Sequence, residues 1–275
     1  MNFNTFKNIY EESADPIRSL IRLAIKRFKI GEYETRIKNG AVNRPHYAHC
    51  VYQAAVLGKK LGYKTISVLE FGVAGGNGLI ELENHAFEVS KITGVDIQIY
   101  GFDMGSGLPQ PLDYRDMPYL WKKGFYKMDV DKLKLKLNKA KLVLGDVSET
   151  VKTFFEEYKP APIGAIMNDL DFYSSTKNSF KLLDGHENNF LPRVFCYFDD
   201  VTAREPHLYN DYTGERLAIN EFNQEHSDIK FGLPYYLITK EIVRQWYHHI
   251  WILHFFSHAK YNNFVHGENL QLPCD

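Results

Sequence analysis

The chain has 275 residues, of which 44% are hydrophobic, and a formal net charge of −1. This length suits one sizeable α/β domain with a decorated terminus, and the balanced charge argues against broad nucleic-acid binding. Cys50, Cys196 and Cys274 lie far apart and form no CxxC pair, which fits a reducing compartment. The sequence shows no signal-peptide pattern and no apolar run of membrane-spanning length. We therefore expect a cytoplasmic enzyme with no transmembrane segment.

Two helices are predicted before the first strand, over about residues 16–29 and 45–61. In the first, apolar residues recur at helical spacing among basic side chains. Such a helix can lie on a membrane or bind a partner helix, but packing on its own domain or on a second subunit is the more ordinary role. These helices predict an N-terminal extension, residues 1–62, which is a candidate homo-oligomer contact, ahead of a main domain, residues 63–275.

The main domain begins with a strand, an acid, a glycine-rich turn and a helix. Apolar residues Ile66–Leu69 lead to Glu70, the turn contains Gly72 and Gly76, and an apolar-periodic run follows from Leu79. Glycines let the backbone turn sharply and approach a ligand closely, and a helix N-terminus offers free N–H groups. This unit predicts a nucleotide-type binding site, although a plain strand-to-helix connection has the same pattern.

Further strand-like segments, at about residues 97–103, 140–146, 163–167 and 194–198, alternate with helical ones. This pattern predicts an α/β fold with a doubly wound, mostly parallel sheet. Residues 110–137 predict a loop with a short helix. The C-terminal region predicts an antiparallel edge hairpin with strands around Tyr235–Val243 and Trp246–Phe256. Its histidines show no HExxH pattern, which favours structural or substrate-facing roles over a second metal site.

Acids close each later strand, where ligands of such sheets bind. Asp103 at the tip of the second strand suits two ribose hydroxyls, and it lies beyond the roughly 20-residue spacing of a dinucleotide fingerprint. Two acid pairs follow the fourth and fifth strands. Carboxylates so close repel one another unless a cation neutralises them, and oxygen ligands suit Mg²⁺ or Ca²⁺. Single acids can instead cap helices or bind backbone amides. The pairs are Asp169 with Asp171 and Asp199 with Asp200.

The sequence resembles class I S-adenosylmethionine-dependent methyltransferases, and within them the macrocin O-methyltransferase type. The segments that carry the likeness are EFGVAGGNG at Glu70–Gly78, YGFDMGSGLP at Tyr100–Pro109, NDLDFYSST at Asn168–Thr176, and YFDDV followed by GERLAINEF at Gly214–Phe222.

The resemblance implies S-adenosylmethionine at Glu70, Gly72 and Gly76, with Asp103 on the ribose and Asp146 on the adenine side. It also implies Mg²⁺ held by Asp169, Asp199 and Asp200.

The activity implied is O-methylation of a hydroxyl on a sugar, glycan or small natural product. A metal-bound hydroxyl loses its proton more readily, and Asp171 and His207 are the candidate general bases. Two other functions stay open, an NAD(P)-dependent oxidoreductase and a non-catalytic methyltransferase-like module that binds a partner.

Overall fold

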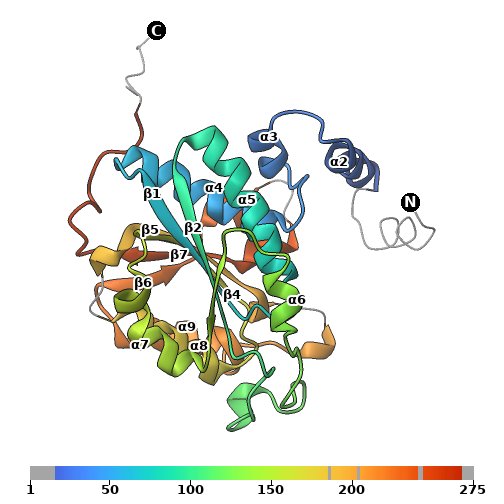
Figure 1. Ribbon diagram of the computed structural model, residues 1–275, viewed down its shortest axis with the longest axis vertical. Coiled ribbons are helices and arrows are strands. Elements are labelled where there is room, and N and C mark those ends of the chain that lie inside the picture. The colour runs from blue at the N-terminus through green and yellow to red at the C-terminus, as the bar shows by residue number, and fades with distance from the viewer. Residues whose placement is uncertain (1–15, 185–186, 203–204, 241–243, 268–275) are drawn as a thin grey trace.

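The computed structural model describes residues 16–184, 187–202, 205–240 and 244–267 (Figure 1). The first fifteen residues of the predicted N-terminal extension, and Cys274, lie outside the described residues. Among the described residues, every helix is too short or too polar to cross a lipid bilayer.

The core of the molecule is a seven-stranded sheet with the order β3-β2-β1-β4-β5-β7-β6. All neighbouring strands pair in parallel except β7, which runs antiparallel to both β5 and β6. The predicted doubly wound sheet with an antiparallel edge is confirmed. The strands are β1 Thr65–Phe71, β2 Asp96–Asp103, β3 Lys141–Leu144, β4 Ile163–Asn168, β5 Phe190–Phe198, β6 Ile229–Gly232 and β7 Ile250–Phe255.

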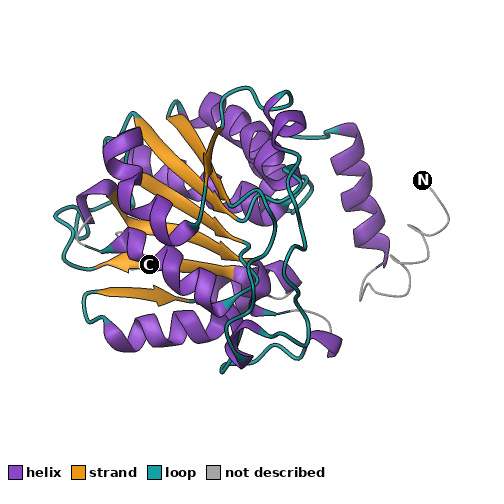
Figure 2. Cartoon of the chain, turned by 60° about the horizontal axis from the view of Figure 1, so that its bottom comes forward, coloured by secondary structure: helices purple, strands orange, loops and turns teal. Residues whose placement is uncertain are grey.

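Helices cover both faces of the sheet (Figure 2). One face packs against α4 and α5, and the other against α7, α8 and α9. Because both faces are covered, β4 is buried along its whole length, as its continuous apolar sequence predicts. The helices are α2 Pro16–Phe28, α3 Tyr33–Lys38, α4 Pro45–Lys60, α5 Asn77–Thr93, α6 Val130–Lys134, α7 Val147–Tyr158, α8 Tyr173–Ser179, α9 Gly214–Glu225 and α10 Tyr235–Ile238.

The two predicted N-terminal helices differ in their surroundings. Helix α4 contacts β4 and β5 and fully buries Tyr47, so it shares the core of the main domain. Helix α2 stands apart from the sheet (Figure 1) and exposes Ile17, Ile21 and Phe28. Association of two copies through α2 stays a prediction.

The prediction of a strand at Tyr235–Val243 is wrong. Residues Tyr235–Ile238 form the short helix α10, and the antiparallel edge is formed by β6 with β7. Aromatic residues favour strands, but Tyr235 and Tyr236 are exposed, and only Leu237 of this segment is buried in the core. Tertiary packing of that one leucine overrides the local preference. The last three residues of the predicted strand lie outside the described residues. The second predicted strand begins later, at Ile250, because Gln245–His249 forms a 3₁₀ turn.

The strand order reverses between β1 and β4. In open α/β sheets a crevice forms at the carboxyl ends of the strands beside such a reversal. The glycine turn follows β1 and the first acid pair follows β4. The topology therefore brings these two sequence features to the same edge of the sheet.

Candidate active site

A cavity of about 930 Å³ lies at the carboxyl edge of the sheet. It brings together the predicted residues Glu70, Gly72, Asp103, Asp146, Asp169, Asp171, Asp199, Asp200 and His207. Gly76 does not line it, because this residue packs under α6, where a Cβ would meet Leu133 Cδ1 at 2.2 Å. Gly75 lines the cavity instead. The glycine turn and the acid pairs therefore face one continuous space.

The glycine turn brings the end of β1 against the end of β4. The N–H of Gly72 donates to the Phe102 carbonyl at 2.9 Å, and the N–H of Asp169 donates to the Phe71 carbonyl at 2.9 Å. Gly72 has φ +85°, and a Cβ there would lie 1.8 Å from the Asp169 carbonyl oxygen. Only glycine allows both this conformation and this close approach.

Asp103 holds the glycine turn from the tip of β2. Its Oδ2 accepts from the N–H groups of Val73 at 3.0 Å and Ala74 at 2.8 Å, and its Oδ1 accepts from Gly105 at 2.6 Å. A carboxylate has about four acceptor sites, so these three bonds leave about one site on Asp103 for a ligand hydroxyl. Asp146 caps α7 by accepting from the Ser148 N–H at 2.8 Å, and it also lines the cavity.

Glu70 is a buried acid at the end of β1. Its Oε1 accepts from the Tyr47 hydroxyl at 2.8 Å, whereas its Oε2 is buried without a hydrogen-bond partner in the described part of the chain. Burial raises the pKa of Glu70 to about 8, although the Tyr47 hydrogen bond and Arg44 oppose the shift. A polar cationic group at Oε2 would satisfy this orphaned acceptor and restore the carboxylate charge.

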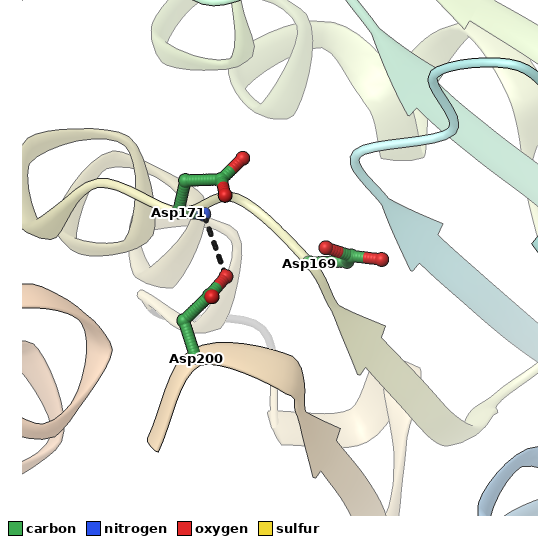
Figure 3. A group of neighbouring side chains, drawn as sticks. All are labelled: Asp169, Asp171 and Asp200. Carbon is green, nitrogen blue, oxygen red and sulfur yellow. Dashed lines mark hydrogen bonds between the residues drawn. The ribbon is translucent and has the colours of Figure 1, made fainter. Parts of the chain in front are cut away.

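Three of the four paired acids form a compact group at the ends of β4 and β5 (Figure 3). One carboxylate oxygen from each of Asp169, Asp171 and Asp200 lies within 4.8 Å of the others. The N–H of Asp171, a residue with φ +59°, donates to Asp200 Oδ2 at 3.1 Å and links the two loops. The Tyr209 hydroxyl donates to Asp200 Oδ1.

Asp199, the other predicted ligand, is not part of this compact group. It lines the same cavity, and its Oδ1 accepts from the Tyr197 hydroxyl.

Electrostatics make this group unfavourable as a set of free anions. Burial first, and then the neighbouring aspartates, raise the pKa of Asp169 and Asp171 well above the usual range and that of Asp200 to about 7. Buried carboxylates shift in this way when no cation neutralises them. Their oxygen donors and spacing fit a hard divalent cation such as Mg²⁺.

Another buried acid, Glu215 at the start of α9, contacts the two loops that carry this group. Its Oε2 accepts from the Asp200 N–H at 2.8 Å, and its Oε1 accepts from the Leu170 N–H at 3.5 Å. No role for Glu215 was predicted from the sequence. A signal was available, because Glu215 falls on the helical stripe of Ala218, Ile219 and Phe222, all of which are buried.

Histidines and aromatic residues line the rest of the cavity. The His207 Nδ1 is buried without a partner in the described part of the chain, and its ring lies 5.5 Å from that of Tyr209. His249 donates from Nδ1 to the Phe198 carbonyl at 2.8 Å and stacks on Tyr197. Among the described residues, no histidine belongs to a cluster of side chains spaced closely enough to bind a metal ion.

No protein-family model matches the sequence, and no curated protein matches it either. Among solved structures, the crystal structure of CalS11, a calicheamicin methyltransferase, aligns with a TM-score of 0.52 at 18% identity, covering 90% of this chain and 88% of that chain. The O-methyltransferase NovP aligns with a TM-score of 0.47 at 13% identity over 66% of this chain and 72% of that one. The apo form of CalS11, described as a TDP-rhamnose 3′-O-methyltransferase, aligns with a TM-score of 0.46 at 17% identity over 90% of each chain. The similarity to the first structure extends along nearly the whole of both chains, and the protein therefore has the Rossmann-like fold of that methyltransferase.

Proposed function

We propose that the protein is an S-adenosylmethionine-dependent, Mg²⁺-assisted O-methyltransferase that acts on a hydroxyl of a sugar, glycan or small natural product. The observation that carries the proposal is that one cavity joins the glycine turn to the carboxylate group of Asp169, Asp171 and Asp200. The fold shared with a calicheamicin methyltransferase supports it.

The cofactor half of the proposed site lies along β1 and β2. Glu70, Gly72 and Asp103 would bind the methionine and ribose parts, and Asp146 the adenine side. Gly75 takes the place that the sequence suggested for Gly76, since it faces the cavity. When bound, S-adenosylmethionine would supply an electrophilic methyl group, and the residues of the turn would hold the cofactor beside the acids, in the cavity that both line.

The acceptor half lies at the acid group. Asp169 and Asp200 belong both to the ligand set suggested by the sequence and to the compact group, so we place them as the central ligands. Asp199 is the third ligand suggested by the sequence, and Asp171 has the position to complete the set or to accept a proton. A bound Mg²⁺ would lower the pKa of a coordinated hydroxyl.

Two side chains are proposed to take the proton of the acceptor hydroxyl. Asp171 is buried at the cavity wall beside Asp169 and Asp200, and a carboxylate positioned next to the reacting hydroxyl can act as its general base. His207 offers an unpartnered buried Nδ1 in the same cavity. Separate Asp171→Asn and His207→Gln variants distinguish them, because loss of the base lowers kcat while the affinity for S-adenosylhomocysteine is kept.

The test separates cofactor binding from metal binding. S-adenosylhomocysteine should bind the wild type in calorimetry, and NAD should not. Mn²⁺, followed by loss of its free electron paramagnetic resonance signal, should bind the wild type but not Asp169→Asn or Asp200→Asn. The exposed, ion-paired Asp211 provides a control variant, Asp211→Asn, that retains Mn²⁺ binding.

Methyl transfer from labelled S-adenosylmethionine to a panel of sugars, nucleotide sugars and catechols should stop in excess EDTA and in Asp199→Ala. That variant should still bind S-adenosylhomocysteine. Undiminished transfer in EDTA would rule out the metal-assisted mechanism. A chain that binds neither S-adenosylhomocysteine nor Mn²⁺ would favour a non-catalytic binding module.

A further inference from the structure

Arg44, at the entrance to α4, has an unusual backbone conformation. It has φ +36° and ψ 64°, in the left-handed region, and Pro45 follows it. Side chains other than glycine occupy this region at a cost, and a residue before proline is also disfavoured in the right-handed helical region. Such strained residues cluster at functional sites. In this conformation the Arg44 side chain lies at the cavity wall, beside the end of β1.

The guanidinium of Arg44 has unused donors. It lies 5.1 Å from the centroid of the Tyr47 ring, and it makes no hydrogen bond or ion pair with any side chain in the described part of the chain. Burial opposes its charge, but Tyr47, Glu70 and Asp169 raise its pKa overall. A guanidinium carries five N–H donors in a planar fork that matches a carboxylate.

Glu70 offers the complementary group at the same end of the cavity. Its Oε2 is buried and unpartnered, and its Oε1 is held by the Tyr47 hydroxyl. Tyr47 therefore contacts both groups, with its ring under Arg44 and its hydroxyl on Glu70. One cationic donor and one anionic acceptor, each with unmet hydrogen-bonding capacity, fit the two charges of an amino-acid zwitterion.

We infer that Arg44 binds the α-carboxylate of the methionine part of the cofactor, while Glu70 accepts a hydrogen bond from its α-ammonium group. The inference rests on the proposed function. It adds a cofactor-binding residue from outside the glycine turn, and it makes the entrance of α4 part of the cofactor site.

The experiment compares three ligands by calorimetry. S-adenosylhomocysteine carries both charged groups, S-adenosyl-3-thiopropylamine lacks only the carboxylate, and 5′-methylthioadenosine lacks both. In Arg44→Gln, the affinity for S-adenosylhomocysteine should fall about ten- to a hundredfold, as for loss of a charge-assisted hydrogen bond. The affinities for the other two ligands should stay unchanged. Arg44→Lys should give an intermediate loss, since it keeps the charge without the fork.

Arg36 provides a matched control. Its guanidinium lies 5.1 Å from the centroid of the Tyr33 ring, the same distance as in the Arg44 pair, but it does not line the cavity. Arg36→Gln should leave all three affinities unchanged. Thermal unfolding of each variant verifies that the fold is kept.

Two results would overturn the inference while leaving the proposed function intact. One is an unchanged affinity of Arg44→Gln for S-adenosylhomocysteine, and the other is an equal loss for all three ligands, which would indicate a general distortion of the cavity or contact with another part of the ligand. A wild-type chain that binds none of the three ligands would instead overturn the proposed function.

Discussion

Replacement of Gly72 by alanine tests how the end of β1 is held against β4. The φ of +85° is unfavourable for alanine, by about 1–2 kcal/mol. The added Cβ would also lie 1.8 Å from the Asp169 carbonyl oxygen, which is backbone and cannot rotate away. Forced overpacking of this kind costs about 1–3 kcal/mol. We therefore expect Gly72→Ala to lower the free energy of unfolding by about 2–5 kcal/mol.

A control variant at Gly62 separates the conformational cost from the steric cost. It has φ +82°, and a Cβ there would meet nothing within 4 Å. Gly62→Ala should therefore lose only the conformational part, about 1–2 kcal/mol. The measurement is the midpoint of urea unfolding at an unchanged m value. Because Gly72→Ala displaces the Asp169 backbone, it should also weaken Mn²⁺ binding, whereas Gly62→Ala should not. Equal losses of stability in the two variants would refute the steric reasoning.

Two further predictions concern the buried acids. The pKa of Asp200 is raised from 3.8 to about 7, so between these values the native state holds a proton that the unfolded chain has lost. This contribution to stability falls as pH rises through that window, by at most about 1.4 kcal/mol per pH unit. In EDTA, the unfolding free energy of the wild type should therefore fall more between pH 4 and 7 than that of Asp200→Asn. Adding Mg²⁺ at pH 7 should restore the stability of the wild type. An equal loss of stability with pH in the two proteins, measured by thermal unfolding, would contradict this reasoning. Tyr47→Phe leaves Glu70 Oε1 buried without its donor. This change should lower the unfolding free energy by about 1–3 kcal/mol and weaken the binding of S-adenosylhomocysteine. An unchanged stability would show that another group replaces the hydroxyl.

Local patterns in the sequence were enough to predict the sheet and most of the candidate site. Apolar runs of strand length, each followed by an acid, alternate with amphipathic helices, and parallel strands must end at the same edge. For this reason Glu70, Asp103, Asp169 and Asp200 could be assigned to one site before their distances were known. An antiparallel hairpin at the edge of the sheet was predicted, but its first strand was assigned to the wrong residues. The strand that forms it, β6, has only four residues and gives little periodic signal.

The remaining features depend on contacts between segments far apart in the chain. The sequence could not show that Asp171 rather than Asp199 joins the compact group of acids, since this depends on how two loops pack. Glu215 lies beneath those loops although it is separated from Leu170 by 45 residues.

Arg44 reaches the cavity, and the Tyr47 hydroxyl reaches Glu70, only because α4 packs on the sheet beside β4 and β5. The sequence by itself determined which acids lie at the ends of the strands, because strand periodicity is local. Only the tertiary structure decided which side chains surround them, since burial and hydrogen bonding there are set by elements that are distant in sequence.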